Sequence, residues 1–374
     1  MKREKSKTNL RSEDRLNYQL PRLLWLLIVP FSFFLSTIAN NRPYLTETVF
    51  SQALYPFFST ILGFLFGWFP LSVAELAIYA VLVLVPVLLI IYFIRWILQK
   101  ISFVKVLGLM ITYLIIAGLL FSAFYFLWGF NYSRPKLAEL MNLNPKPRPA
   151  HQLEALGRML ADEAKLLRPL VAEDENGGFV LPEGYRPYFE KIVEAYKQLG
   201  QTEPQFSRKV YPAKGILASK ALSYSGISGI FMPFTGEPNV NVDQPPLLLL
   251  SSAAHESAHF LGIAREDEAN FIAYLACIQS EDPSIRYSGI MHALITSGNK
   301  LRDADSEAYA ALRSMYSEGM KRDLANYSAY WKQFEGPMEE AVTTINDNYL
   351  KFNRQESGVQ SYGEMVDLLL AYYF

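Results

Sequence analysis

The chain has 374 residues, 51% of them hydrophobic, and a formal net charge of −1 at pH 7. This length has room for more than one folded unit, and the near-neutral charge gives no reason to expect nucleic-acid binding. The single cysteine, Cys277, excludes an internal disulfide. Its place in a periodic apolar run predicts a small buried residue and not a reactive thiol.

The first third of the chain has the composition of a membrane anchor. Lysine and arginine crowd the first 22 residues, whereas long stretches between residues 23 and 130 carry almost no charge. A hydrocarbon core requires about 20 consecutive apolar residues. Three segments meet this requirement and are predicted to be transmembrane helices, at about 23–39, 76–94 and 106–130. No small-residue cleavage site follows Ala39, so we expect the first helix to be retained and not removed as a signal peptide.

A fourth uncharged segment, 48–74, is interrupted by proline and glycine and is interpreted as an interfacial or re-entrant element. With three spanning helices, the basic N-terminus and the basic loop at 95–105 both lie in the cytoplasm, as the positive-inside rule prefers. The chain beyond residue 130 is then extracytoplasmic, and the protein is a multi-pass protein of the cell membrane. The alternative is that 48–74 does span, which would place the rest of the chain in the cytoplasm.

The remainder is predicted to be a soluble, mainly α domain. Residues 1–130 form the anchor, 131–149 a linker that begins in an aromatic interface belt, and 150–374 the domain. Apolar periodicity predicts helices at 151–168, 188–199, 266–278, 306–319, 337–352 and 362–374. Short β-rich pieces between 208 and 242 predict a small sheet or hairpin, with Pro233 confining its strand to an edge. His151, at the head of the first helix, is expected to be a surface residue.

One motif carries the chemistry: His255-Glu256-Ser257-Ala258-His259. In a helix, the imidazoles at positions i and i+4 project from one face and can bind one metal ion, and the glutamate beside them can transfer a proton. The apolar run that precedes the motif predicts that this helix is buried. The pattern therefore predicts metal-assisted hydrolysis with Zn²⁺ as the cofactor and Glu256 as the general base.

A catalytic zinc requires a third protein ligand, and Glu266, Asp267 and Glu268 compete for this position. The helical face of Glu266 also carries Ala269, Asn270 and other small residues, which would let two helices approach closely. We therefore place Glu266 first and Glu268 second as the ligand. Asn270 is a candidate hydrogen-bond partner for a ligating histidine.

The run HESAHFLGIAREDEANFIAYLAC resembles the HExxH plus ExEAN pattern of gluzincin-type membrane metallopeptidases, and this resemblance implies Glu266 as the third zinc ligand. Most of the chain resembles the bacterial membrane proteins of the domain of unknown function 3810 family, in the same broad zincin group. The resemblance lies in the three N-terminal helices and in the stretches 128–132, 234–237 and 361–363. Peptidases with an ExxAD motif have aspartate where this chain has Asn270, so its histidine contact is expected to differ.

The expected function is a membrane-anchored zinc metallopeptidase with a zincin-like α+β domain, acting on extracytoplasmic proteins or peptides. Tyr224, Tyr287 and His292 are candidates for the oxyanion donor by residue type alone, and none is assigned. The alternative is a non-catalytic binding or signalling module that keeps the fold. Glu256 favours the enzyme, because a module without catalysis has no need of a base. An intramembrane peptidase is less attractive, because the motif lies far beyond the last apolar segment.

Overall fold

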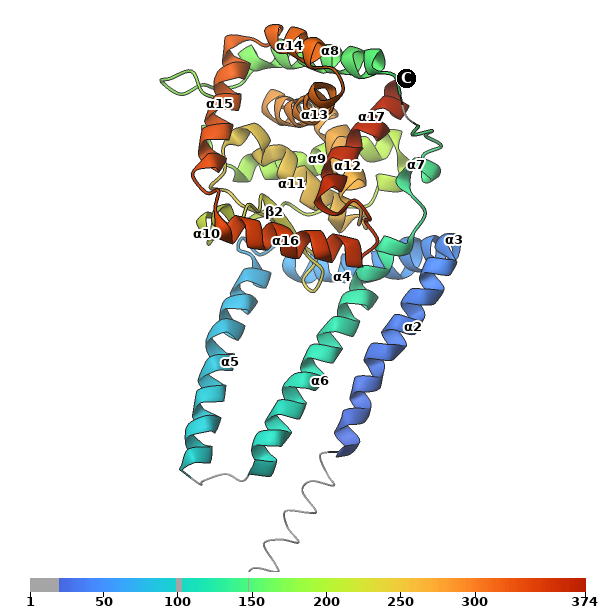
Figure 1. The fold of residues 1–374 in the computed structure, drawn as a ribbon, viewed down its shortest axis with the longest axis vertical. Helices are drawn as coiled ribbons and strands as arrows, with labels where there is room; N and C mark the ends of the chain where they lie inside the picture. Colours follow the sequence, from blue (N-terminus) through green and yellow to red (C-terminus); the bar gives the residue numbers. More distant parts are fainter. Residues whose placement is uncertain (1–19, 99–102, 147) are drawn as a thin grey trace, which may run out of the picture.

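The computed structural model describes residues 20–98, 103–146 and 148–374. The basic segment 1–19 and Lys100, on which the topology prediction depends, lie outside these ranges. The fold is mainly helical, with apolar helices near the N-terminus and a small three-stranded sheet, as the sequence predicts. Three long helices stand side by side below a helical body (Figure 1).

These three long helices correspond to the three predicted spans. They are the continuous segment η1–α2 (Leu20–Leu27 and Ile28–Asn41), α5 (Val73–Ile97) and α6 (Phe103–Leu127). Each is long and apolar enough to cross a membrane. The third ends three residues earlier than predicted, because Trp128 and Phe130 are buried in the core of the body. A 3-10 turn, η3 (Gly129–Ser133), follows it.

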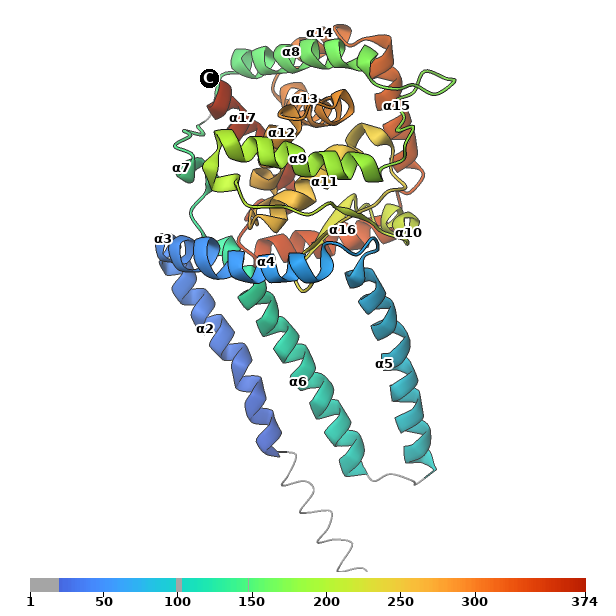
Figure 2. The same cartoon turned by 180° about the vertical axis from the view of Figure 1, so that it is seen from behind.

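The fourth uncharged segment forms one continuous rod of α3 (Pro43–Thr46), the π-helical η2 (Glu47–Leu54) and α4 (Tyr55–Phe66). Its length and composition would also suffice to cross a membrane. The rod lies across the upper ends of the other three helices, directly beneath the body (Figures 1 and 2). Polar contacts fix it there: Glu47 pairs with Arg134 at 2.7 Å, and Ser51 donates to Asn131 at 2.9 Å.

The body packs its helices in layers around a core of α8, α9, α11, α12 and α13 (Figures 1 and 2). Its helices are α7 (Leu137–Leu140), α8 (Ala150–Leu167), η4 (Arg168–Leu170), α9 (Arg186–Thr202), η5 (Pro204–Phe206), α10 (Ser219–Tyr224), α11 (Pro246–Phe260), α12 (Glu266–Ile278), α13 (Pro283–Ala304), α14 (Ser306–Ser314), α15 (Glu318–Lys332), α16 (Pro337–Phe352), η6 (Gly358–Glu364) and α17 (Met365–Tyr373). Cys277 is buried, and His151 is exposed.

Two predicted helices are shorter in the structure than expected. The helix predicted at 306–319 ends at Ser314, and α15 begins after Ser317, whose hydroxyl accepts the N–H of Met320 and caps the new helix. The last helix begins at Met365 and not at residue 362. The residues before it form the 3-10 turn η6, in which Ser361 bonds back to Gly358.

The sheet has the order β1-β3-β2, with β1 (Lys214–Gly215) parallel to β3 (Glu237–Val240) and β2 (Gly229–Met232) antiparallel to it. The register pairs Gly229 with Val240 and Met232 with Glu237. Strand β2 is thus an edge strand and ends just before Pro233, which has no N–H for a further pairing. Strand β3 leads into α11, so the sheet lies beside the helix that carries the HExxH motif.

A buried carboxylate joins α5 to the sheet. Glu237 of β3 accepts the backbone N–H groups of Val73 and Ala74 at the first turn of α5 and forms an ion pair with Lys214 of β1. Glu75, in the same turn of α5, accepts two backbone N–H groups just after β1. The free N–H groups of a helix start are natural anion sites, so this end of α5 is fixed to the body.

Removing Lys214 is expected to destabilise the protein strongly. The side chains of Lys214 and Glu237 are 5% and 1% exposed, so Lys214→Met leaves a buried carboxylate without its cation. Breaking such a pair costs about 3–5 kcal/mol. Urea unfolding in detergent, followed by tryptophan fluorescence, measures this loss. The matched control is Lys197→Met, whose exposed pair with Glu194 contributes about 0–1 kcal/mol; similar losses for both variants would contradict the prediction.

Candidate metal centre

Helix α11 carries the HExxH motif in the centre of the body. It begins at Pro246, where a missing N–H costs nothing, and it is buried along nearly its whole length. It ends at Phe260, and Gly262 follows with a φ of +91°, a left-handed conformation that glycine adopts without strain. The chain then reverses into α12, which starts at Glu266. This turn brings the first residue of α12 back to the motif.

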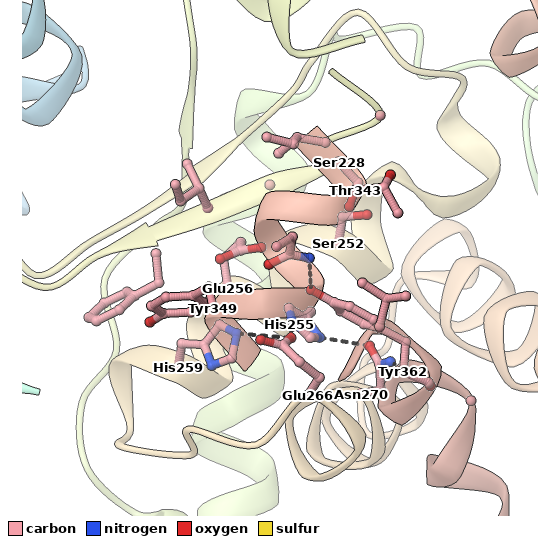
Figure 3. A pocket seen from close by; sticks show the side chains of 18 of the residues that line it. Ser228, Ser252, His255, Glu256, His259, Glu266, Asn270, Thr343, Tyr349 and Tyr362 are labelled. Atoms are coloured by element: carbon pink, nitrogen blue, oxygen red, sulfur yellow. Dashed lines mark hydrogen bonds and ion pairs between the residues drawn. The ribbon is translucent and has the colours of Figure 1, made fainter. Parts of the chain in front are cut away.

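The two histidines and Glu266 converge on one point (Figure 3). The Nε2 atoms of His255 and His259 lie 3.0 and 3.5 Å from the same oxygen, Oε2 of Glu266. One ligand atom from each of the three residues lies within 4.8 Å of the others, and all three side chains are buried.

The carboxylate of Glu266 and the two imidazoles shift one another's pKa values. Burial would lower the pKa of His259, but the Glu266 carboxylate outweighs burial and raises this pKa to about 9. The pKa of Glu266 is held below its ordinary range: burial would raise it, but the two imidazoles lower it more.

The second nitrogen of each imidazole has its own partner. Nδ1 of His255 lies 2.7 Å from Oδ1 of Asn270, whose amide nitrogen donates to the backbone carbonyl of Tyr362 at 3.0 Å. Nδ1 of His259 lies 2.6 Å from the backbone carbonyl of Ile263. Both Nδ1 atoms therefore donate, so in each neutral imidazole Nε2 is the nitrogen with the lone pair and can bind a metal.

Glu256 lies beside the cluster without joining it. It is 4% exposed, and the backbone N–H of Phe231 in β2 is a donor to its carboxylate. Its Oε2 has no hydrogen-bond partner among the residues that the structure describes. Burial raises the pKa of Glu256 to about 7. Strand β2 approaches so closely that a Cβ at Gly229 would lie 2.5 Å from the Glu256 carboxylate. The absence of a side chain at position 229 therefore makes room for the carboxylate.

Side chains from distant parts of the chain hold the C-terminal end of α11. The hydroxyl of Tyr55, in α4, donates to the carbonyls of His259 and Phe260 at 3.2 and 2.9 Å. Arg208 donates to the same Phe260 carbonyl, and Arg134 donates to the carbonyl of the glycine that follows the helix. These carbonyls have no partner within α11, and two cations suit the negative end of the helix dipole.

The other candidate residues lie elsewhere. Glu268 is buried but points away from the histidines, because its carboxylate accepts the backbone N–H of Leu137 at 2.7 Å. Tyr287 donates to Asp323, and Tyr224 packs against Phe334. Neither tyrosine lines the cleft into which the cluster opens. His292 does line the cleft. Burial, together with the nearby His255, lowers its pKa to about 4, so it is neutral at pH 7.

Three tyrosines that the sequence analysis did not select surround the cluster. Tyr362 of η6 points toward Glu266 (Figure 3), and its pKa lies well above the ordinary value because of burial and the Glu266 charge. Its phenol therefore stays protonated and able to donate. The hydroxyls of Tyr132 and Tyr349 lie 3.2 Å apart on the opposite side. The only sequence signal for Tyr362 was its place in the Ser-Tyr-Gly stretch, which carries no chemistry by itself.

The cluster opens into a cleft of about 1200 Å³. The residues 225–233 with strand β2, helix α16, helix α13 and the upper end of α6 form its walls. This volume exceeds the roughly 300–1,000 Å³ of ordinary small-molecule sites. The cleft is thus large enough for a segment of polypeptide.

The family model described as protein of unknown function (DUF3810) matches residues 50–370. The chain belongs to this family. The match confirms the family predicted from the sequence and includes most of the rod, the long helices α5 and α6, and nearly the whole body. Comparisons with curated proteins and with solved structures give no match. For this DUF3810 protein the grouping with zincins therefore stays a prediction that depends on the site itself.

Proposed function

We propose that this DUF3810 protein is a membrane-anchored zinc metallopeptidase of the zincin type that hydrolyses peptide bonds in extracytoplasmic proteins or peptides. The observation that carries the proposal is the convergence of two imidazole Nε2 atoms and one carboxylate oxygen beside a buried glutamate that has a free oxygen. His₂Glu is a known ligand set of catalytic zinc, with a fourth position left open.

The donor set fits zinc. The ligand atoms of His255, His259 and Glu266 lie within 4.8 Å of one another, so one ion could be held by all three. Both Nδ1 atoms are engaged as donors, as histidines that bind metal through Nε2 require. Zinc, when bound by His255, His259 and Glu266, supplies a Lewis acid that makes hydroxide available near neutral pH.

The chain's own residues perform the proton transfers. Glu256 takes the proton of the attacking water and delivers it to the leaving nitrogen, and its unpaired Oε2 is the atom available for this task. Tyr362 donates a hydrogen bond to the oxygen that becomes negative as the carbonyl is attacked, because its phenol is protonated and lies beside the cluster. Neither Tyr224 nor Tyr287 is proposed for this role.

Strand β2 binds the substrate. One edge of β2 pairs with β3, and residues 228–233 line the cleft. On the other edge the N–H of Phe231 donates to Glu256, and no strand of the described residues pairs there, so an extended peptide can bind beside it. Such β-augmentation uses main-chain hydrogen bonds and requires little sequence specificity. The substrate would then lie between β2 and the metal centre, with its carbonyl near Glu256.

The membrane arrangement that we propose has three spanning helices, η1–α2, α5 and α6. The rod α3–η2–α4 lies at the surface of the bilayer, and the body lies on the extracytoplasmic side. The rod's orientation across the ends of the three helices supports this arrangement (Figure 1). So does the charge bias of the flanking segments, which places the basic loops in the cytoplasm.

Removing the metal should abolish hydrolysis reversibly. The purified full-length protein is expected to contain about one zinc per chain, to lose its metal and its cleavage of a random peptide mixture on chelation, and to regain both with zinc. His259→Ala should lose the metal outright. Elemental analysis and mass spectrometry of the products measure both effects. A protein that holds no stoichiometric metal, or cleaves equally well after chelation, would contradict the proposed function.

A further inference from the structure

Helix α16 carries an exposed apolar stripe that leads into the cleft. Met338, Val342, Ile345, Tyr349 and Phe352 recur at helical spacing and share one face. Met338, Ile345 and Phe352 are 56%, 67% and 59% exposed, although soluble surfaces rarely keep such a stripe uncovered. Val342, Ile345 and Tyr349 also line the cleft. The stripe is thus part of the wall of the site.

One end of the stripe is continuous with the long apolar helices. The ring of Phe352 lies 6.5 Å from that of Phe33 in α2, and the ring of Tyr349 lies 6.4 Å from that of Phe124 in α6. Helix α16 lies at the base of the body, next to the upper ends of these helices (Figure 1). An apolar path therefore runs from the surface of α2 and α6 along α16 into the cleft.

The metal centre itself lies close to the end of α6. Trp128 is the first residue after this helix, and its ring lies 5.7 Å from the ring of His259 and 4.8 Å from that of Phe231 in β2. Phe124 and Trp128 both line the cleft. A ring contact made one residue beyond the helix places His259 within about 10 Å of the helix end. In the proposed membrane arrangement, the site is therefore close to the surface of the bilayer.

The wall formed by α13 is polar, in contrast to α16. It presents Thr296, Asn299, Lys300 and Asp303 to the cleft. An extended polypeptide in this cleft would meet apolar side chains where the cleft adjoins α6 and polar side chains along α13. A polypeptide segment that emerges from a bilayer has side chains in the same order, apolar next to the bilayer and polar farther from it.

We propose that the substrates are membrane-anchored polypeptides, which the site cleaves in the segment next to the bilayer. That segment enters beside α6 along the apolar stripe of α16. This inference rests on the proposed peptidase function and specifies its substrate class. The stripe, the adjoining helices and the height of the metal centre support it together.

The test uses full-length protein in phosphatidylcholine vesicles together with a probe that has one transmembrane helix followed by a randomised 30-residue segment. The control is the same segment without the helix. An extended chain advances about 3.3 Å per residue, so we expect cuts from about three to ten residues beyond the anchor. The unanchored segment should be cut throughout its length. Cut positions are determined by mass spectrometry, and an even spread of cuts in the anchored probe overturns the proposal.

A variant pair tests the stripe. Ile345→Asp places a charge on the path and should lower cutting near the anchor about tenfold relative to cutting of the unanchored segment. Thr344→Asp places the same side chain on the same helix, at an exposed position that does not line the cleft, and should leave this ratio unchanged. If Ile345→Asp lowers the cleavage of both probes equally, the stripe does not select the anchored substrate, and the proposal is overturned.

A binding measurement separates this inference from the peptidase function. In the Glu256→Gln protein, a photoreactive residue at position 345 should cross-link to the anchored probe within about ten residues of its helix. Cross-linking without any cleavage by the wild-type protein supports the binding site and contradicts the peptidase. Cleavage of the unanchored segment alone, without cross-linking to the anchored probe, supports the peptidase and overturns the substrate class.

Discussion

The Glu256→Gln protein is expected to retain about one zinc per chain and to hydrolyse peptides about 10²–10⁴-fold more slowly than the wild type, the usual contribution of a general base. Glu256 is not among the three converging ligands, so its replacement should leave the metal bound. Glutamine keeps the size of the side chain and can still accept the N–H of Phe231. Single-turnover kinetics and elemental analysis of the same samples measure the two effects.

Glu335→Gln is the matched control for this prediction. Glu335 is exposed and lies outside the cleft, so the same chemical change there should alter neither the metal content nor the rate. If Glu256→Gln cleaves at the wild-type rate, Glu256 is not the base. If it loses its zinc, Glu256 belongs to the ligand set and the assignment of the three ligands is wrong.

The second large effect is expected at the third ligand. Loss of an outer partner of a metal ligand lowers metal affinity about 10–100-fold, so loss of a ligand itself should exceed this range. We expect Glu266→Gln to weaken zinc binding by more than about 100-fold. We expect Asn270→Ala to weaken it by about 10–100-fold, because Asn270 holds His255 and is not one of the three converging ligands. Competition with a fluorescent zinc chelator measures the affinities.

Glu268→Gln supplies the comparison, since Glu268 stands two residues away in the same acidic run. Its carboxylate accepts the N–H of Leu137, and an amide oxygen can do the same. Zinc affinity should therefore change little. If instead Glu268→Gln loses the metal while Glu266→Gln keeps it, Glu268 is the third ligand, and α12 is rotated about its axis relative to the structure.

The local patterns of the sequence predict the helices, and the three residues proposed as ligands lie together in the structure. The i, i+4 spacing of the histidines, the small face of α12 and the glycine after α11 are all short-range signals, and the structure brings Glu266 to the two imidazoles. The apolar helices are equally local, because length and composition alone identify them. Such signals require no knowledge of how the chain folds back on itself.

The remaining features depend on contacts between residues distant in sequence. Tyr362 lies about 100 residues beyond the motif and reaches the site because Asn270 bonds to its carbonyl. No periodicity predicts that Tyr55 donates to α11, or that Glu237 holds the start of α5. The end of α6 was misplaced for the same reason: Trp128 and Phe130 look like membrane residues by composition, yet the core of the body buries them.

The hydrogen bonds from Tyr55, Arg208 and Arg134 connect the end of α11, and with it the candidate metal centre, to distant parts of the chain. If the chain were cut between α4 and α5 and the N-terminal part lost, Tyr55 would no longer reach the carbonyls of His259 and Phe260. The N–H of Gly262 and the side chain of Arg208 would still donate to these carbonyls, so each lost hydrogen bond costs about 0.5–1.5 kcal/mol, and the cost falls on the helix that carries the candidate ligands. A cut at that point would weaken the candidate metal centre. In the proposed membrane arrangement, α5 and α6 would still hold the remaining chain in the bilayer, so the cut would not release the site as a soluble fragment.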